Sequence, residues 1–99
     1  MITVSILGAG FMGQAHTSNY QALGDRVRVS TVCGRDPERA RKLAEQTGAE
    51  ATDDLDAAID SADVVDICLP TPLHREAAER AFAAGKHVFL EKPMAVTVA

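Results

Sequence analysis

The sequence lacks the features that mark several specialised classes of protein. No apolar run approaches the ~20 residues that a membrane-spanning helix needs, and no basic segment precedes the first apolar run, as it would in a signal peptide. The ten Lys and Arg residues are scattered, and the formal net charge is -4. Nucleic acids and anionic membranes are therefore not expected partners, because their binding surfaces gather positive charge. We predict a cytoplasmic protein.

Cysteine is also scarce. The only two cysteines, Cys33 and Cys68, each lie at the end of an apolar run. They have neither the CxxC spacing of many zinc sites nor a neighbouring pair of histidines. This pattern favours reduced, packed thiols over a disulfide or a metal site, so we expect no metal centre.

Short apolar runs alternate with segments of helical pattern along the whole chain. The composition, 46% hydrophobic and 24% charged, is that of an ordinary globular protein, and its 99 residues fit one domain. Val and Ile bounded by Gly, Pro or Asp predict strands at 2–7, 26–33, 63–69 and 87–92, with a weaker one at 50–52. Helices are predicted at 11–23, 36–47, 53–62 and 73–84. Asp36 and Pro37 suit a helix start, and Gly24, Gly48 and Gly85 suit helix ends.

The predicted order is β-α-β-α-(β)-α-β-α-β, with a helix between each strand and the next. Strands joined in this way pair in parallel through right-handed crossovers, which place helices on both faces of one sheet. The sequence therefore predicts an α/β fold with a doubly wound parallel sheet of the Rossmann type.

A glycine-rich loop, Gly8-Ala9-Gly10-Phe11-Met12-Gly13, joins the first predicted strand to the first helix. In this βαβ context the G-x-G-x-x-G pattern indicates dinucleotide binding. Gly8 permits a tight turn, Gly10 leaves room for a pyrophosphate, and Gly13 lets the helix pack closely on the strand. The anion would bind the free amides of this helix end, including those of Phe11 and Met12.

The end of the second strand bears on the choice of dinucleotide. A carboxylate at this position binds the ribose hydroxyls of NAD, whereas a small residue followed by Arg suits the 2′-phosphate of NADP. The sequence here is Cys33-Gly34-Arg35, and Asp36 is better explained as a helix cap. The pattern favours NADP over NAD, although Arg35 can equally stack on adenine without discriminating between them.

A second candidate loop, Leu69 to His74, follows the strand at 63–69. Ligands of open α/β sheets bind along the carboxyl ends of the strands, so Pro70 and Thr71 are predicted to line the nicotinamide end of the cofactor site. His74 and His16 lie in predicted helices, where packing or capping is the expected role of each.

The segments "GAGFMGQAH" and "LPTPLHREAAERAFAAGKHVFLEKPMA", with the spacing between them, resemble the amino-terminal part of the Gfo/Idh/MocA oxidoreductases. This family includes glucose-fructose oxidoreductase and inositol dehydrogenase, and the resemblance spans the whole chain. It implies hydride transfer between NAD(P) and a hydroxyl-bearing carbon of a sugar, cyclitol or related polyol. It also implies that Lys92 is the catalytic residue near the substrate hydroxyl, with Glu91 at the cofactor and Pro93 shaping the turn.

The chain departs from the family pattern in two respects. The family's T-P-N-x-x-H loop reads Leu69-Pro70-Thr71-Pro72-Leu73-His74 here, which alters side-chain contacts to the cofactor. The family's second, substrate-binding domain has no counterpart in the 99 residues. We therefore expect residues 1–99 to be the NAD(P)-binding Rossmann domain of a longer two-domain enzyme that forms a homo-oligomer. The alternative is an isolated dinucleotide-binding or self-associating module without turnover.

Overall fold

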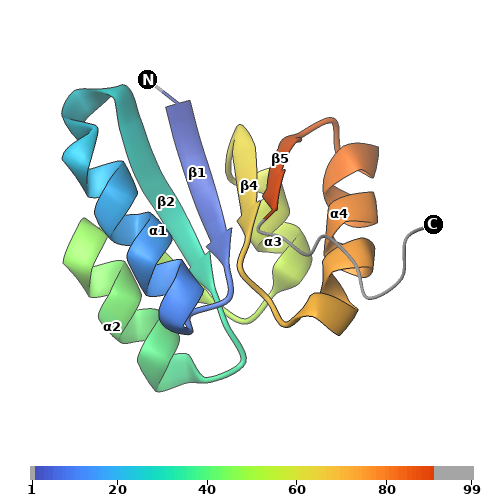
Figure 1. Ribbon diagram of the computed structural model, residues 1–99, viewed down its shortest axis with the longest axis horizontal. Helices are drawn as coiled ribbons and strands as arrows, with labels where there is room; N and C mark the ends of the chain where they lie inside the picture. Colours follow the sequence, from blue (N-terminus) through green and yellow to red (C-terminus); the bar gives the residue numbers. More distant parts are fainter. Residues whose placement is uncertain (1, 91–99) are drawn as a thin grey trace.

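The computed structural model describes residues 2–90, which form a parallel sheet with helices on both faces (Figure 1). The strands are β1 (Ile2–Leu7), β2 (Val27–Cys33), β3 (Glu50–Thr52), β4 (Val64–Ile67) and β5 (His87–Leu90). The helices are α1 (Phe11–Ala22), α2 (Pro37–Thr47), α3 (Leu55–Asp60) and α4 (His74–Ala83). Two 3-10 turns, Gly24–Arg26 and Thr71–Leu73, precede β2 and α4.

The strand order in the sheet is β3-β2-β1-β4-β5, and every neighbouring pair is parallel. The chain winds outward from β1 in one direction and then returns to wind outward in the other, so the predicted doubly wound fold is confirmed. The carboxyl ends of β1, β2, β4 and β5 lie towards the lower edge of the sheet in Figure 1, and the parallel pairing with β2 places that of β3 at the same edge. In such a fold, ligands bind along this edge, next to the strand where the winding reverses.

Two apolar cores, one on each face of the sheet, hold the layers together. Strand β1 contributes to both, because its successive side chains point to opposite faces. Val4 and Ile6 pack with α2, whereas Leu7 packs with α3 and α4. The α2-side core comprises Val4, Ile6, Ala9, Val29, Val32, Ala40, Leu43 and Ala44. The core on the other face comprises Leu7, Cys33, Ala58, Ile59, Val65, Ile67, Ala77, Ala78 and Ala81.

Strand β2 contains an irregularity beside β1. Val4 pairs with Val29 but Ser5 pairs with Thr31, so Ser30 is an extra residue in the ladder. A bulge of this kind shifts the alternation of side chains by one position. Consequently Val29 and Val32, although three residues apart, both join the α2-side core.

Side-chain caps fix where two of the helices begin. The Asp36 carboxylate accepts hydrogen bonds from the backbone N–H groups of Glu38 and Arg39, at 3.1 and 3.3 Å. The predicted cap at Asp36 is therefore confirmed. Helix α3 is shorter than the predicted 53–62, because Asp54 accepts from the Ala57 N–H and the helix starts only at Leu55.

At the amino ends of β1 and β4, Thr3 and Asp63 form a reciprocal set of hydrogen bonds. The Thr3 N–H and hydroxyl both donate to Asp63 Oδ2, at 3.2 and 3.1 Å, and the Asp63 N–H donates to Thr3 Oγ1 at 3.1 Å. The backbone bond from Thr3, followed by that from its hydroxyl, holds the pKa of Asp63 below its usual value. This contact lies at the sheet edge opposite to the carboxyl ends.

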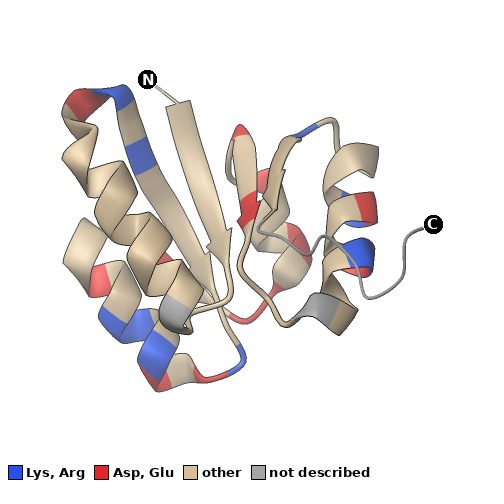
Figure 2. Cartoon of the chain, in the orientation of Figure 1, with Lys and Arg blue, Asp and Glu red and all other residues tan. Residues whose placement is uncertain are grey.

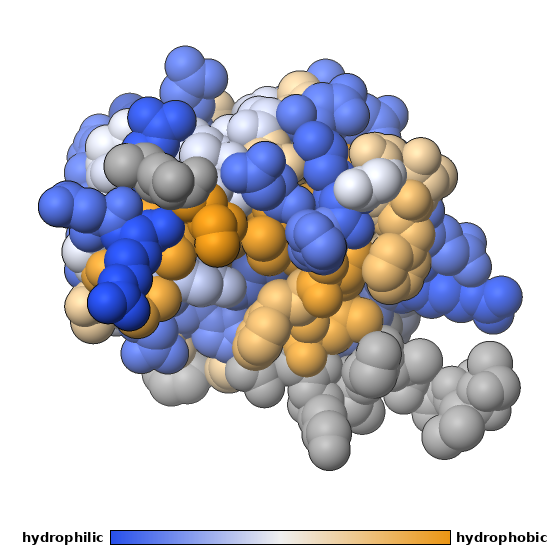
Figure 3. All heavy atoms as spheres, turned by 90° about the horizontal axis from the view of Figure 1, so that it is seen from above, coloured by the Kyte–Doolittle hydropathy of each residue, from blue (hydrophilic) through white to orange (hydrophobic). Residues whose placement is uncertain are grey.

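Apolar side chains are also exposed in several places. Seen from the end where β1 begins, apolar surface lies between hydrophilic residues (Figure 3). Ile2, Phe82 and Phe89 are among the exposed large hydrophobic residues.

No helix in the segment from residue 2 to residue 90 combines the length and apolar character needed to span a bilayer.

Candidate functional site

The turn after β1 requires glycine at position 8. Gly8 has a φ of +110°, which L side chains rarely adopt, and its N–H donates to the Cys33 carbonyl oxygen at 2.7 Å. A Cβ at Gly8 would lie 2.6 Å from the carbonyl oxygen of Cys68. The close approach of three segments thus explains this glycine, and it agrees with the predicted tight turn.

Gly13 and Gly10 differ in their surroundings. A Cβ at Gly13 would overlap the carbonyl oxygen of Gly8 and touch the Ile6 side chain, so α1 can pack this closely only with glycine there. At Gly10, which caps α1, a Cβ would meet no described atom within 4 Å. Gly13 is therefore needed for packing, whereas Gly10 borders open space.

The amino end of α1 offers backbone amides to that open space. The first N–H groups of a helix have no intrahelical acceptor, and here they belong to Phe11, Met12 and Gly13. Gly10 supplies no side-chain cap, and the first turn of α1 carries no acidic residue. An anion would therefore meet free donors and the positive end of the helix dipole without a competing carboxylate on that turn.

A cleft of about 480 Å³ opens in front of this helix end. Three segments that follow β1, β2 and β4 line it, as expected for the carboxyl edge of the sheet. Its lining includes Gly8, Gly10 and Met12 from the first segment, Gly34, Arg35 and Arg39 from the second, and Cys68, Leu69 and Pro70 from the third. The predicted residues Gly8, Gly10, Met12, Arg35 and Pro70 are thus brought together.

Positive charge borders the cleft on the side of α2. Arg35 and Arg39 both line it, and Figure 2 shows basic and acidic residues together around the start of this helix. The Asp36 Oδ1 atom is engaged by two backbone amides, and its Oδ2 lies 3.6 Å from Arg39 Nε. Asp36 is therefore committed to the helix start, as the sequence predicted.

The loop after β4 is held by its own backbone and by His74. The Leu73 N–H donates to the Pro70 carbonyl oxygen at 2.9 Å, within the 3-10 turn that Thr71 begins. His74 is buried, and its Nε2 contacts the Leu69 carbonyl oxygen at 2.5 Å. The expected packing role of His74 is thus consistent with its position, since it fixes the loop that carries Pro70.

The predicted catalytic residue Lys92 and its neighbours Glu91 and Pro93 lie outside the described residues. The preceding strand, β5, pairs with β4 so that Leu90 lies opposite Ile67. Strand β5 therefore ends on the same edge of the sheet as the cleft.

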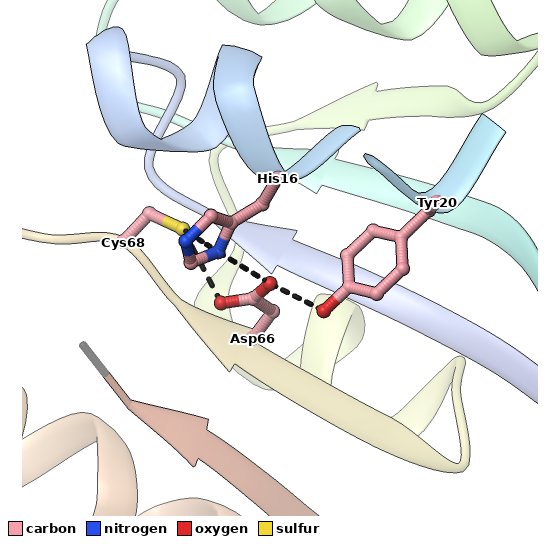
Figure 4. A network of polar contacts seen from close by, with 4 residues as sticks. All are labelled: His16, Tyr20, Asp66 and Cys68. Atoms are coloured by element: carbon pink, nitrogen blue, oxygen red, sulfur yellow. Dashed lines mark hydrogen bonds and ion pairs between the residues drawn. The ribbon is translucent and has the colours of Figure 1, made fainter. Parts of the chain in front are cut away.

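A buried polar cluster under α1, which we call the Asp66 network, was not predicted from the sequence. It consists of His16, Tyr20, Asp66 and Cys68 (Figure 4). The fully buried Asp66 carboxylate lies 2.8 Å from His16 Nδ1 and accepts a 2.5 Å bond from the Tyr20 hydroxyl. The Cys68 thiol donates to its other oxygen at 3.3 Å. His16, expected only to pack, is thus also part of a charged cluster.

Two sequence signals could have revealed this cluster. Asp66 interrupts the apolar run 63–69, and a charged residue in a buried strand needs partners. His16 and Tyr20 are four residues apart, which places them on one face of a helix. Their pairing with Asp66, 50 and 46 residues away, depends on the packing of α1 against β4.

His16, Asp66 and Cys68 are residue types that bind metals, and one potential ligand atom from each lies within 4.8 Å of the others. The His16 Nδ1 to Asp66 Oδ2 distance is 2.8 Å. Tetrahedral zinc, with N and O ligands at about 2.0–2.1 Å, would hold these two atoms roughly 3.3 Å apart. The shorter distance is that of a charge-assisted hydrogen bond.

Tyr20 is expected to make the fold sensitive to alkali. Burial first, and then the hydrogen bond and negative charge of Asp66, raise the pKa of Tyr20 far above its usual value. The folded protein therefore favours the neutral phenol. The resulting stability is fully present below about pH 10, the pKa of an unfolded tyrosine, and is lost as the pH rises above it. Tyr20 is the only tyrosine and no tryptophan is present, so near-ultraviolet absorbance reports its ionisation alone.

We expect tyrosinate absorbance and the circular dichroism of unfolding to change together above about pH 10. Ionisation of Tyr20 near pH 10 in a protein that keeps its dichroism would contradict the buried hydrogen bond. A Tyr20→Phe variant lacks the ionisable group. Its free energy of unfolding should therefore fall less between pH 7 and alkaline pH than that of the original chain.

Comparison with known proteins agrees with this geometry. The family model described as "Oxidoreductase family, NAD-binding Rossmann fold" (GFO_IDH_MocA) matches residues 2–99. Levoglucosan dehydrogenase of Pseudarthrobacter phenanthrenivorans is 40% identical over 106 residues, covering 97% of this chain and 27% of that protein.

Two solved structures are similar over nearly the whole chain. A levoglucosan dehydrogenase in complex with NADH has a TM-score of 0.87 and 36% identity, over 95% of this chain and 28% of that one. Biliverdin reductase from Synechocystis sp. PCC 6803, in complex with biliverdin and NADP+, has a TM-score of 0.87 and 31% identity, over 97% of this chain and 31% of that one.

The 99 residues span about 30% of the length of these relatives. The family match covers nearly every residue, and it includes the glycine loop, the cleft and the reversal of strand order beside β1. The chain therefore belongs to the Gfo/Idh/MocA oxidoreductases, at their NAD-binding Rossmann fold.

Proposed function

We propose that this chain is the dinucleotide-binding part of an NAD(P)-dependent oxidoreductase that acts on a sugar, cyclitol or related polyol. The observation that carries the proposal is the cleft in front of α1. There, Gly10 leaves space and the first turn of the helix presents amides without an acidic residue. These are the properties that a pyrophosphate requires of its binding site.

The residues of the cleft suit the parts of such a cofactor. The amides of Phe11, Met12 and Gly13 would hold the pyrophosphate, and Arg35 with Leu69 would lie against the adenosine. Pro70 and Thr71, which follow β4, would border the nicotinamide, and Glu91 would approach it from the end of β5. A bound nicotinamide supplies the position that gives or accepts a hydride.

For the chemical step we propose Lys92 as the group that exchanges the proton of the substrate hydroxyl. A lysine amine can donate to a developing alkoxide or, with a lowered pKa, accept the hydroxyl proton. The resemblance to the family supports this role, and so does the edge of the sheet at which β5 ends. Hydride transfer requires both reactants to be held in contact. We therefore propose that residues 1–99 alone bind the cofactor without turnover. We also propose that the longer enzyme is a homo-oligomer and acts in the cytoplasm.

We further propose a preference for NADP over NAD. Arg35, Asp36 and Arg39 line the cleft, and the Oδ1 atom of Asp36 is engaged by backbone amides. A 2′-phosphate would therefore meet positive charge, whereas the ribose hydroxyls of NAD would lack a free carboxylate from this turn. The relatives include structures with NADH and with NADP+, so both cofactors occur in similar proteins.

Titration of the purified chain with NADPH and with NADH, followed by dihydronicotinamide fluorescence, tests both proposals. We expect NADPH to bind more tightly, and Arg35→Ala to weaken NADPH by about tenfold or more. The same variant should weaken NADH by less than about threefold, because an exposed Arg contributes little without the phosphate.

Arg28→Ala is the matched control, because Arg28 is exposed in β2 and belongs to the part of the strand remote from the cleft. It should leave both affinities unchanged. If neither cofactor binds at millimolar concentration, dinucleotide binding is wrong. If NADH binds more tightly than NADPH, only the cofactor preference is wrong.

A further inference from the structure

The Asp66 network connects the helix that would hold the pyrophosphate to the wall of the cleft. We propose that His16 and Asp66 form a positioning pair, which sets dinucleotide affinity without touching the cofactor. This inference rests on the proposed dinucleotide-binding function. It assigns a role to the buried carboxylate of Asp66, for which the proposed contacts between the cleft residues and the cofactor give no reason.

One end of the network lies at the cleft. Cys68 is a cleft residue, and its Sγ is 3.3 Å from both His16 Nδ1 and Asp66 Oδ1. The backbone of Cys68 is equally constrained, because its N–H donates to the Leu7 carbonyl oxygen at 2.7 Å and its carbonyl oxygen abuts Gly8. The cleft wall after β4 is thus tied to the turn of the glycine loop by its backbone and to α1 by its side chain.

The other side of the network fixes α1. His16 lies in α1, six residues beyond its cap at Gly10, so a shift of His16 moves the amides at the start of the helix. Asp66, fully buried in β4, draws His16 towards the sheet. The Phe89 ring of β5 meets the imidazole edge-to-face, with a centroid distance of 5.4 Å. The imidazole is therefore held from two strands, which leaves α1 little freedom to slide.

The charge of Asp66 is what makes this arrangement demanding. A buried carboxylate is stable only with donors, and here His16, Tyr20 and Cys68 supply them. If an amide replaces the carboxylate, its NH₂ group faces either the Cys68 thiol, which is a weak acceptor, or His16 and Tyr20, which donate to the carboxylate. The contacts that hold α1 and Cys68 in place are then weakened. A displacement of about 1 Å in a binding group can reduce its effect markedly. The expected readout is therefore a loss of affinity beyond any loss of stability.

Asp66→Asn is the direct test, and Asp63→Asn is its matched control. Both replace a hydrogen-bonded aspartate of the same strand region, but Asp63 lies at the amino end and bonds only to Thr3 among the described side chains. Affinity for NADPH is measured at a temperature at which thermal unfolding shows each variant to be folded. We expect Asp66→Asn to bind NADPH about five- to tenfold more weakly, and Asp63→Asn to stay within about twofold of the original chain.

His16→Gln and the double variant His16→Gln/Asp66→Asn complete the experiment. If the two residues act as a pair, the double variant should bind NADPH no more weakly than whichever single variant has the lower NADPH affinity. The reason is that both single changes remove the same interaction, which can be lost only once. If Asp66→Asn does not fold, His16→Gln alone decides, with the same expected loss. Fully additive losses, or losses no greater than that of Asp63→Asn, would overturn the proposal.

The controls also separate this inference from the proposed function. If the original chain binds neither NADPH nor NADH, the proposed function has failed. If it binds but the Asp66 and His16 variants bind equally well, only the positioning pair has failed. Addition of zinc or of a chelator should leave NADPH affinity unchanged. If zinc or the chelator changes the NADPH affinity of the original chain but not that of the His16 and Asp66 variants, these residues form a metal site and the positioning pair is wrong.

Discussion

Gly13→Ala is expected to destabilise the folded chain severely. The added methyl group would overlap the carbonyl oxygen of Gly8, which is backbone and cannot rotate away. It would also contact the Ile6 side chain in the α2-side core. Helix α1 would have to lift from the sheet, at a cost of about 3 kcal/mol or more. That is a large part of the roughly 5–15 kcal/mol that stabilises a typical domain.

Gly10→Ala is the matched control, since its Cβ meets no described atom within 4 Å. It should lower the free energy of unfolding by no more than about 1 kcal/mol, the usual difference between helix caps. The methyl group would nevertheless occupy the approach to the helix end, so dinucleotide affinity should fall by at least about tenfold. Urea unfolding and NADPH titration of both variants distinguish the effects. Equal stability of the two variants would contradict the close packing described for Gly13.

Lys92→Ala, made in a chain extended to the length of its relatives, is expected to abolish turnover while leaving cofactor affinity intact. Removal of a general acid or base typically lowers the rate by about 10²–10⁴-fold. NADPH affinity should change little, because the proposed pyrophosphate site consists of the amides at the start of α1. The rate of NADPH oxidation or NADP+ reduction, measured with polyols and sugars as substrates, gives the turnover. Fluorescence titration gives the NADPH affinity.

Lys86→Ala is the control for the removal of a lysine next to β5. Lys86 immediately precedes β5 at the amino end of the strand, where its Nζ lies 3.5 Å from the Asp60 carbonyl oxygen. The Lys86 variant should turn over normally. Normal turnover by the Lys92 variant would remove this residue from the mechanism, and loss of NADPH binding would assign it to the cofactor instead.

Local chemistry in the sequence was enough to predict most of the fold. The cap at Asp36 depends on residues two and three positions away, so it is visible in the sequence itself. The glycine loop is likewise recognisable, because the turn requires Gly8 and the packing of α1 requires Gly13. The parallel order followed from the alternation of strands and helices, which allows few connections.

Features that depend on contacts between distant segments were not predictable in the same way. The extra residue Ser30 in β2 reflects the register against β1, which no pattern within β2 reveals. The 53–62 helix was predicted too long, because Asp53 and Asp54 both suit a helix start and only the fold selects Asp54. His16 was interpreted as a packing residue, since its partner Asp66 lies 50 residues away.

That separation of 50 residues has a consequence for the order in which the chain folds. Closing a long loop costs conformational entropy before the contacts that reward it can form. Strands β1 and β2 and helix α1 precede β4 in the chain, so the bonds from His16 and Tyr20 to Asp66 can form only when β4 is present. The turn at Gly8 waits as well, since it rests against Cys68. The cleft is therefore completed only once β4 has been synthesised and docked.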